Sequence, residues 1–429
     1  GLFSGIGDFF SERAFEAIGA ILLIAVGMLT KRYIVPLLKT ALIRLTAEHL
    51  LTIADDVTDY FMEKYPNAHL ILGGASVSIL RETLTKPNKL WEFYDSVAIG
   101  PGEEVLLKLY EQLNSSSPDL DKVPQITWKD ETGKLHSSSA NPTFTLEDIA
   151  TPIFLDSRKN PVLPLMTSEG CDWAGCKFCH FPTIFSDKKT SYKKRPKEHV
   201  LRDLKILTER HNPTYFYISD TNVSTERIRE LSDLLNNSDF HPRMYAFIRG
   251  DKEFTDINFC RDIKKAGFFA LHFGLESGSQ KVLDDMNKGI SVQDCSQIIK
   301  NLYKVGIMAN VFLIAGTPTE TEKDLALSIN FLKEHAPYLT QISIERFYLD
   351  KGCQIQKHPE KYGIIIDKSD VNDLQIDFRF RYDRKINPYG ASIEDSLKRV
   401  EKIYRETGSP ASYFDFLFME IIRKFYPEK

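Results

Sequence analysis

The sequence predicts an α/β protein in three parts, and two patterns along the chain support this prediction. Between residues 160 and 349, six apolar runs of strand length alternate with stretches whose apolar residues recur at helical spacing. Two earlier apolar runs each end in glycines, and a helical pattern follows the second. Strands that alternate with helices are typical of parallel sheets. We therefore expect one unit at residues 1–145, a second at 146–349 and a C-terminal region at 350–429.

The first unit is expected to be a Rossmann-like domain with a parallel sheet. Its second half is the clearer part, because two short buried strands there lead into glycine turns. The stretch after it is rich in Ser, Asp, Lys and Pro and is expected to be a loop or small hairpin. The expected elements are strand 40–46, helix 47–65, strand and turn 69–74, strand and turn 96–104, helix 105–113 and loop 114–141.

The second unit is expected to be a partial (β/α)6 TIM barrel, whose active site would lie at the C-terminal ends of the strands. Gly267 and Gly306 stand where helices are expected to stop. Residues 350–429 would form a cap over the barrel mouth, with a helix at 393–407 and an aromatic-rich segment at 413–426. The expected strands are 162–168, 215–219, 244–249, 269–275, 309–315 and 342–349, and the helices 198–209, 225–235, 254–265, 292–305 and 320–335.

The composition limits the function classes that fit the chain. Its 429 residues carry a net charge of −4, which does not favour bulk nucleic-acid binding. Three of its six cysteines fall within nine residues. A disulfide framework usually spreads its cysteines through a small secreted domain. The clustering therefore indicates a metal site and a reducing, cytoplasmic setting.

Residues 17–29 form an apolar run of 13 residues. A membrane-spanning helix needs about 20 residues, and a secretory signal carries positive charge before its apolar stretch, which is missing here. We expect a buried or partner-facing helix, and leave membrane contact and a targeting role open. The chain begins without Met, so it could start inside a longer protein.

The cysteine cluster follows the first barrel strand and consists of Cys171, Cys176 and Cys179. Three thiolates on one loop can hold three irons of a [4Fe–4S] cube and leave the fourth iron open for an outside ligand. Structural zinc is the alternative, with His180 as a fourth ligand, but no second ligand pair is in sequence reach. The other cysteines are expected to be buried thiols: Cys260, Cys295 and Cys353.

The loop SEGCDWAGCKFCHF, residues 168–181, resembles the cluster loop of radical S-adenosylmethionine (SAM) enzymes. Its C-x4-C-x2-C spacing is one residue longer than the common C-x3-C-x2-C, a variant known from the cobalamin-binding branch and from peptide-modifying members. Residues 274–278 (GLESG) and 283–289 (LDDMNKG) resemble the fourth-strand signature of the family. Residues 315–321 (AGTPTET) resemble its fifth-strand turn. The resemblance covers about residues 161–349.

The resemblance implies that the open iron binds SAM, and that reductive cleavage gives a 5′-deoxyadenosyl radical that takes a hydrogen atom from substrate. Asp220 and Arg249 also have structural interpretations, as a turn cap and as an ordinary salt-bridge partner. His272 is a weaker substrate-site candidate, on the same face as Glu276 only if no bulge intervenes. The implied SAM contacts are Phe178 near adenine, Asp220 for the amino group, Arg249 for the carboxylate, Glu276 and Ser277 for the ribose or methionyl part, and the Leu313 to Gly316 backbone beside adenine.

A basic run at residues 188–195, with Tyr192 inside it, follows the cluster loop. Its default interpretation is a solvated surface, and the functional one is a patch for an acidic substrate or an electron-donor protein. The expected partners are thus a small-molecule or peptide substrate and a reducing electron donor, without nucleic acid.

Residues 69–78 and 95–109 resemble the second half of the cobalamin-binding domain found in many radical SAM enzymes. The D-x-H-x-x-G motif that supplies a lower ligand is absent and the first strand is hard to identify, so the domain could be truncated or degenerate. A similar fold without ligand is the alternative. The residues that would line cobalamin are Gly73, Gly74, Ser76, Gly100, Gly102 and Glu103.

Three functions follow from these alternatives. With cobalamin, the expected reaction is C-methylation or a related modification of a peptide or natural product. Without it, cross-linking, rearrangement or oxidation is expected. The third hypothesis is a non-catalytic iron–sulfur or zinc module, which predicts no SAM cleavage and no convergence of Glu276, Asp220 and Arg249 on the cluster.

Overall fold

The computed structural model describes residues 64–65, 68–154, 162–184, 192–367, 374 and 376–383. Several predicted features lie outside these residues. They are the apolar run 17–29, the strand 40–46, all of the helix 47–65 except its last two residues, the helix 393–407 and the segment 413–426.

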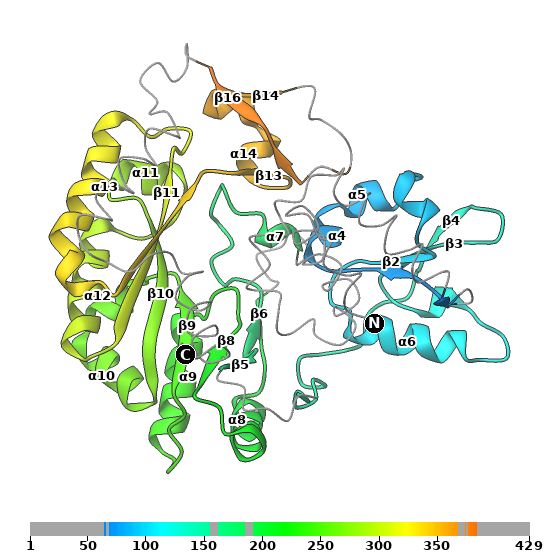
Figure 1. Cartoon of the computed structure of the whole chain (residues 1–429), viewed down its shortest axis with the longest axis horizontal. Helices are drawn as coiled ribbons and strands as arrows, with labels where there is room; N and C mark the ends of the chain where they lie inside the picture. Colours follow the sequence, from blue (N-terminus) through cyan, green and yellow to red (C-terminus); the bar gives the residue numbers. More distant parts are fainter. Residues whose placement is uncertain are drawn as a thin grey trace, which may run out of the picture.

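The second unit contains the predicted parallel sheet. Its six strands lie in the order β12-β11-β10-β9-β8-β5, and every neighbouring pair is parallel (Figure 1). Sequence order is kept across the sheet, as a partial (β/α)6 barrel requires. All six predicted strands are confirmed: β5 (Val162–Leu165), β8 (Tyr215–Ile218), β9 (Met244–Ile248), β10 (Phe268–Glu276), β11 (Met308–Ala315) and β12 (Gln341–Arg346).

Helices cover the outer face of this sheet, and local signals fix their ends. Ser224 and Ser291 accept hydrogen bonds from backbone N–H groups of the first turns they cap, and Thr321 forms a capping box with Asp324. Gly267 (φ 107°) and Gly306 (φ 73°) follow two helices in the left-handed conformation, as predicted. The helices are α8 (Lys197–His211), α9 (Thr225–Asn236), α10 (Ile257–Lys265), α12 (Val292–Lys304) and α13 (Glu322–His335), with the unpredicted short α11 (Gln280–Asp285).

The N-terminal unit has a mixed sheet rather than the parallel sheet expected. β1 (Ile71–Leu72) and β2 (Ser96–Ala98) are parallel, but β3 (Ile126–Lys129) and β4 (Leu135–Ser137) continue the sheet antiparallel. The predicted small hairpin is this β3–β4 pair. The all-parallel expectation was wrong because β3 returns antiparallel beside β2 after α6, and the short turn at residues 130–134 then reverses the chain from β3 to β4. α4 (Ala75–Ile79), α5 (Arg81–Leu84) and α6 (Glu103–Leu113) complete the described part of the unit.

The cluster loop leads into α7 (Phe181–Ile184), which packs against α4 of the N-terminal unit (Figure 1). Ile184 belongs to the same apolar cluster as Leu84, Trp91 and Ile376. The segment that carries the cysteines therefore lies between the barrel and the N-terminal unit.

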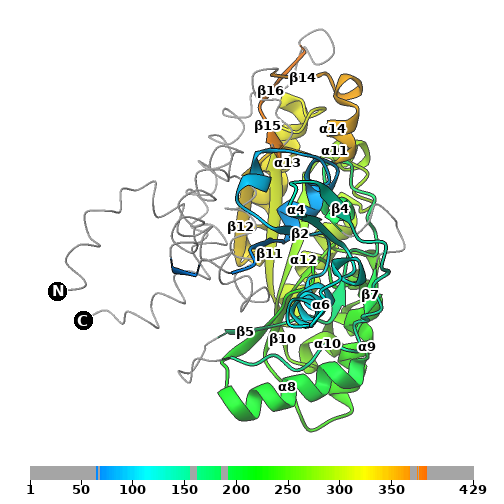
Figure 2. The same ribbon diagram turned by 90° about the vertical axis from the view of Figure 1, so that its right-hand side faces the viewer.

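The described part of the C-terminal region lies beyond the end of β12. Figures 1 and 2 both place β14 and β16 at one end of the molecule and α8 at the other. Phe178 of the cluster loop and Ile314 of β11 pack against its apolar cluster, which includes Phe347 and Phe378. This position agrees with the predicted cap. Its elements are β13 (Leu349–Asp350), α14 (Gln354–Lys357), β14 (Ile364–Ile366), β15 (Asp377–Phe378) and β16 (Phe380–Tyr382).

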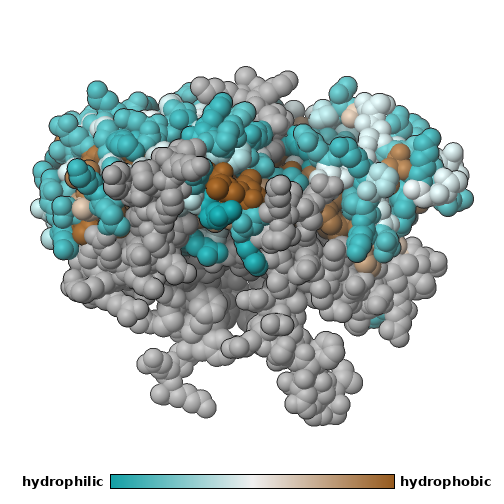
Figure 3. Space-filling view, turned by 90° about the horizontal axis from the view of Figure 1, so that it is seen from above, coloured by the Kyte–Doolittle hydropathy of each residue, from teal (hydrophilic) through white to brown (hydrophobic). Residues whose placement is uncertain are grey.

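The described surface is mainly hydrophilic on the face seen in Figure 3, with small apolar patches. Within the described residues, no helix has the length and apolar character needed to cross a membrane.

Candidate active site at the strand ends

The three predicted cluster cysteines share one loop at the carboxyl end of β5. Each is partly exposed, and the N–H of Cys179 donates to the carbonyl of Cys176 at 3.2 Å. Burial raises the pKa of Cys176 and of Cys179, and repulsion from the neighbouring thiolates raises both further. The three thiols are therefore close enough to affect one another, and a positive partner would be needed to keep them ionised together.

The three thiols can be compared with the needs of an iron–sulfur cluster and of a zinc ion. In the part of the chain that the structure describes, no three His, Cys, Asp or Glu side chains are placed to hold a metal ion. His180, the suggested fourth zinc ligand, contacts Asp350 Oδ2 through Nδ1 at 2.7 Å, and its buried Nε2 has no hydrogen-bond partner among the described residues, so Nε2 stays available as a ligand atom. A [4Fe–4S] cube needs thiolates that lie farther apart than the ligands of a single metal ion, because each thiolate binds a different iron.

The four residues between Cys171 and Cys176 are held by the segment 286–289. Trp173 Nε1 donates to the carbonyl of Asn287 at 2.9 Å, and Asn287 Nδ2 donates to the carbonyl of Gly175 at 2.7 Å. A Cβ on Gly289 would lie 2.4 Å from the Trp173 ring. The long first gap of the cysteine motif is thus accommodated by a specific docking surface.

Glu276 lies at the end of β10 and is buried, with its backbone in the left-handed region at φ 61°. A register shift of the β10–β11 pair between Gly274 and Glu276 accompanies this conformation. Glu276 Oε1 contacts Lys288 Nζ at 2.7 Å, and Lys288 is also buried. Both charges act on the pKa of the Cys176 thiol, Lys288 to lower it and Glu276 to raise it. The predicted Glu276 therefore does lie beside the cysteines.

Sequence reasoning missed Lys288. The signal was available, because Lys288 is the only cation in the signature segment 283–289. Nothing in the spacing, however, shows that Lys288 turns inward while Lys281 lies on the surface.

Arg249 follows β9 and also lies beside the cluster loop. Its guanidinium forms an ion pair with Asp251 and stacks over the Trp173 ring, with its carbon 4.3 Å from the ring centroid. It lowers the pKa of the Cys176 thiol. The structure thus shows the salt-bridge interpretation, while contact with a SAM carboxylate stays a prediction.

Asp220 follows β8, and both oxygens of its carboxylate accept hydrogen bonds from residues at the base of the cluster loop. Its carboxylate accepts from the Thr167 N–H and Thr167 Oγ1, both at 2.6 Å, and from Ser168 Oγ at 2.5 Å. Burial raises the pKa of Asp220, and these hydrogen bonds oppose the rise. This is a structural role of the kind weighed in the sequence, and its predicted contact with the SAM amino group is untested.

The remaining SAM candidates do not all face the cysteines. Ser277 Oγ contacts Ser328 Oγ at 3.1 Å, and Leu313 belongs to the core between sheet and helices. Phe178 packs against the C-terminal apolar cluster instead of lying open beside the loop. The predicted adenine contact of the Leu313 and Gly316 backbone stays untested, and Leu313 lies within β11, which is paired on both sides.

The fifth-strand turn is held by two residues that the sequence did not single out. Glu320 Oε2 accepts from the Gly316 N–H at 2.6 Å, and the Tyr382 hydroxyl donates to the Gly316 carbonyl. Burial raises the pKa of Glu320 to about 7. Tyr382 comes from the C-terminal region, so this region contacts the turn directly.

A polar row crosses the inner face of the barrel, made of His272, Asn310 and Gln341, which pair side by side on β10, β11 and β12. All three are buried, and Asn310 Oδ1 and both amide atoms of Gln341 have no hydrogen-bond partner among the described residues. Burial lowers the pKa of His272 to about 3, so its ring is neutral. The β-bulge after Gly274 breaks the alternation proposed to link His272 with Glu276, but a 4.9 Å ring contact with Phe247 keeps His272 on the inner face.

The glycine turns of the N-terminal unit lie at the adjacent carboxyl ends of β1 and β2. Ser78 joins them, since its hydroxyl donates to the Gly74 carbonyl at 3.1 Å and accepts from the Gly100 N–H at 2.9 Å. Ligands of open α/β sheets bind at such strand ends. Of the other cobalamin candidates, Gly73 is exposed after β1, Ser76 is in α4, Gly102 caps α6 and Glu103 begins it.

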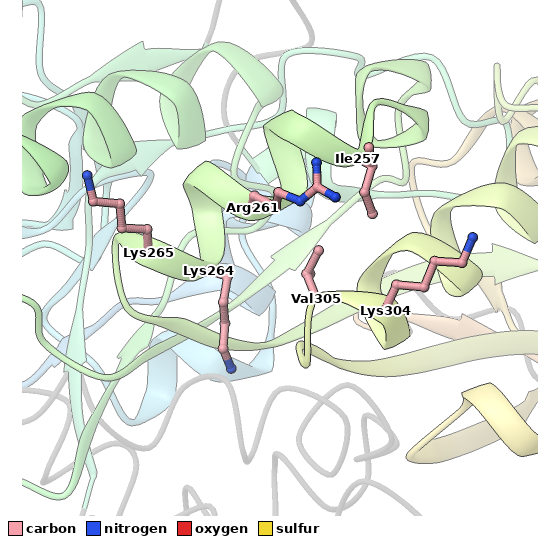
Figure 4. A pocket seen from close by; sticks show the side chains of 6 residues that line it. All are labelled: Ile257, Arg261, Lys264, Lys265, Lys304 and Val305. Atoms are coloured by element: carbon pink, nitrogen blue, oxygen red, sulfur yellow. The ribbon is translucent and has the colours of Figure 1, made fainter.

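A hollow of about 320 Å³ lies elsewhere, between the last turns of α10 and α12 (Figure 4). It is lined by basic side chains, among them Arg261, Lys264 and Lys304. β10 and β11 begin directly after these helices, so the hollow is at the amino ends of the strands, opposite to the cysteines. It is not part of the candidate site.

Residues 165–332 match the family model of the radical SAM superfamily. This span includes the three cysteines, Glu276, Lys288 and the turn at Gly316.

Among curated proteins, the chain is 26% identical over 317 residues to the cytidylyl-2-hydroxyethylphosphonate methyltransferase of Streptomyces wedmorensis, covering 63% of this chain and 55% of that protein. It is 25% identical over 350 residues to an uncharacterized methyltransferase of Pyrococcus horikoshii, covering 79% and 71%. The chain thus spans little more than half the length of the first of these relatives.

Two solved structures share the fold. The cobalamin-dependent radical SAM enzyme OxsB, with aqua-cobalamin and SAM bound, superposes with a TM-score of 0.63 at 16% identity, covering 88% of this chain and 65% of OxsB. The radical SAM methyltransferase TsrM from Kitasatospora setae, with tryptophan substrate and a SAM analogue bound, gives 0.56 at 16% identity, covering 73% and 64%.

Proposed function

The chain belongs to the radical SAM superfamily through its domain at residues 165–332 and is an enzyme, and we propose that Cys171, Cys176 and Cys179 hold a [4Fe–4S] cluster for SAM cleavage. When bound, such a cluster supplies the electron that cleaves the sulfonium of SAM. The organic chemistry belongs to the cofactors, and the protein binds, orients and excludes side reactions.

The observation that carries the proposal is the shared position of three thiols, the buried Lys288 and the partly buried Arg249. Arg249 follows β9, Lys288 lies in the loop after α11, and both act on the Cys176 thiol. Thiolates need such cations to stay ionised while partly buried. Asp220 would hold the base of the loop in place through Thr167 and Ser168.

The further proposal is cobalamin-dependent methylation of a carbon in a small molecule or peptide. Two relatives are methyltransferases by name, and OxsB is cobalamin-dependent. In this chain, the Gly74 and Gly100 turns meet at the carboxyl ends of β1 and β2, where a cofactor of this kind would bind. An electron-donor protein would have to supply the reducing equivalents.

A reaction without cobalamin is the second candidate. It is favoured by the absence of the D-x-H-x-x-G motif and by the antiparallel β3–β4 hairpin next to β2. The same cluster site would then serve cross-linking, rearrangement or oxidation.

Anaerobic reconstitution with iron and sulfide tests both levels of the proposal. The visible spectrum should show an iron–sulfur charge-transfer band, and after dithionite reduction the protein should convert SAM to 5′-deoxyadenosine. Incubation with hydroxocobalamin followed by gel filtration should leave corrin bands on the protein. A Cys176→Ala variant should lose the cluster band and the 5′-deoxyadenosine.

Cys353→Ala is the matched control, because Cys353 is buried in the C-terminal apolar cluster and should leave both signals unchanged. Cluster formation without SAM cleavage would contradict the enzyme proposal for this site. Cleavage without retained corrin would remove the methylation proposal and leave the second candidate.

A further inference from the structure

We propose that Lys288 is the positioning residue that offsets the negative charge of the cysteine-bound cluster, and that Glu276 limits this effect as its counter-ion. The inference rests on the proposed function, because it assumes a cluster on the three cysteines. It gives the Glu276–Lys288 pair a role in setting the reduction potential of the site.

The ion pair occupies a space built for it. The Lys288 and Glu276 side chains are 8% and 9% exposed, with Nζ and Oε1 2.7 Å apart. A Cβ on Gly274 would lie 2.0 Å from Glu276 Oε1 and 2.6 Å from Lys288 Nζ. Only a glycine on the inner side of β10 leaves room for the pair, so the pair is packed against the strand rather than free in solvent.

The backbone around Lys288 is fixed by the segment that docks the cluster loop. The Lys288 N–H donates to the Leu283 carbonyl at 2.9 Å, and Arg249 Nη1 donates to the Lys288 carbonyl at 3.4 Å. The neighbouring Asn287 is bound on both sides to the loop through Trp173 and Gly175. Any cluster held by this loop would therefore keep a fixed relation to the ammonium of Lys288.

The ion pair lies next to the segment that docks the cluster loop. Lys288 Nζ is 2.7 Å from the Glu276 carboxylate, which keeps the ammonium paired with an anion, and the adjoining Asn287 binds Gly175 of the loop. The ammonium therefore stays charged beside the loop. Three thiolates give a [4Fe–4S] cluster a net negative charge, and reduction adds one more electron. In a site of low dielectric, a fixed cation stabilises the reduced form preferentially.

Arg249 differs from Lys288 because its guanidinium is only partly buried and is engaged with Asp251 and with the Trp173 ring. Removing Lys288 would leave the Glu276 carboxylate buried beside the cysteines without its cation. Removing the Glu276 charge would leave the Lys288 cation without its anion. The two changes should therefore have opposite signs.

The test is an EPR-monitored redox titration of the anaerobically reconstituted holoenzyme in the absence of SAM. Lys288→Met should shift the midpoint potential to more negative values, and Glu276→Gln should shift it to less negative values. The double variant, with neither charge, should return towards the wild-type potential. Lys281→Met is the matched control, because Lys281 is exposed and pairs with Asp285 on α11. Its potential should not move.

Iron content and far-UV circular dichroism report whether each variant assembles. If Lys288→Met does not assemble a cluster, Lys288→Arg and the double variant test the inference instead. The midpoint potentials of both are expected to lie close to that of wild type. Shifts of the same sign in the two single variants, equal shifts in Lys281→Met, or a double variant as far displaced as Lys288→Met would overturn the inference. Failure of the wild type to assemble any cluster would instead overturn the proposed function.

Discussion

The barrel and the N-terminal unit both place glycine turns at the ends of parallel strands, but they differ in where their charged side chains lie. In the barrel, Arg195 pairs with Asp203 and Lys288 with Glu276, and all four side chains are at least nine-tenths buried. In the N-terminal unit, the shifted carboxylates are exposed and bind turns, as Asp130 does in the β3–β4 hairpin.

Burying an ion pair is expensive, and an apolar pair would often be as stable. The barrel therefore keeps charges that its stability alone does not require, and it keeps them around the loop that bears the cysteines. The comparison teaches that the chemistry is concentrated in the barrel, while the N-terminal unit is held by apolar packing and surface turns. Five changes, each with its own measurement, can break or sharpen this contrast.

The largest effect is expected for Arg195→Ala. Arg195 Nη2 lies 2.7 Å from Asp203 Oδ2, and Nη1 donates to the Met166 carbonyl at 2.9 Å. Removing one member of a buried pair costs about 3–5 kcal/mol, because it leaves a buried charge unpaired. Urea unfolding followed by circular dichroism measures the loss. Arg202→Ala removes a half-exposed cation from the same Asp203 and should cost less than about 1 kcal/mol. Equal losses would show that burial does not distinguish these pairs.

The pH dependence of stability should have opposite signs in the two regions. Glu320 has a pKa raised from 4.5 to about 7 in the folded barrel, so the folded state binds its proton more tightly than the unfolded state. Its contribution is complete below pH 4.5 and is lost as pH rises to about 7, a total of about 3 kcal/mol at 1.36 kcal/mol per pKa unit. Glu320→Gln should remove this slope in unfolding free energies measured from pH 5 to 8.

Asp130 is the counterpart in the N-terminal unit. Hydrogen bonds from Thr132 and His136 lower the pKa of Asp130, so its contribution is present above its ordinary pKa of 3.8 and is lost as pH falls below it. The unfolding free energy of Asp130→Asn should therefore be lower than that of wild type at neutral pH. The difference should disappear as the pH falls below 3.8. For Glu320, the contrary outcome is a Glu320→Gln protein whose unfolding free energy keeps the wild-type slope between pH 5 and 7. That result would contradict the raised pKa of Glu320.

The same glycine substitution should cost more in the barrel than in the hairpin. Gly267 and Gly133 both have positive φ, at 107° and 82°, so alanine strains the backbone at either site. A Cβ on Gly267 would also lie 2.0 Å from the Pro242 carbonyl oxygen, whereas one on Gly133 meets nothing within 4 Å. Gly267→Ala should therefore be about 2 kcal/mol more destabilising than Gly133→Ala in urea unfolding. Similar losses would mean that backbone strain alone decides both sites.

The smallest expected effect is an increase in the unfolding free energy, on replacement of Gln341. Both amide atoms of Gln341 are buried without a partner in the described part of the chain, which costs stability. Gln341→Leu should raise the unfolding free energy by about 1 kcal/mol, because the apolar side chain removes that cost. A matched Gln356→Leu change, which removes an amide that accepts from the Gly352 N–H at 3.0 Å, should not be stabilising. A loss for Gln341→Leu would show that its amide is satisfied by polar partners.

The barrel was predictable from the sequence because its strands are buried on both faces, and so read as apolar runs, and because its helices stop at glycines. Gly267 and Gly306 mark real helix ends, and Ser224, Ser291 and Thr321 mark helix starts. These are local signals, and they lie within a few residues of what they determine. The cysteine spacing is local in the same sense.

The contacts between elements were not predictable in this way. Lys288 meets Glu276 because a bulge turns the end of β10, and Asp220 is occupied because Thr167 happens to end the neighbouring strand. The antiparallel direction of β3 beside β2 is a pairing between strands that α6 separates in the chain, so the sequence of β3 alone does not show it. Pattern reasoning therefore finds candidate residues at strand ends but does not show which of them are already engaged.

Docking of the stretch from Trp173 to Gly175 on residues 286–289 has a consequence for protein engineering. The cysteine motif and residues 286–289 depend on each other, because Trp173 and Gly175 hydrogen-bond with Asn287 and the Trp173 ring occupies the space beside Gly289. If the motif were moved into a barrel with the shorter cysteine gap, the Trp173 indole would lose its binding site. It would then lie in solvent or collide with a side chain at the position of Gly289. A functional chimera would have to carry both pieces across together.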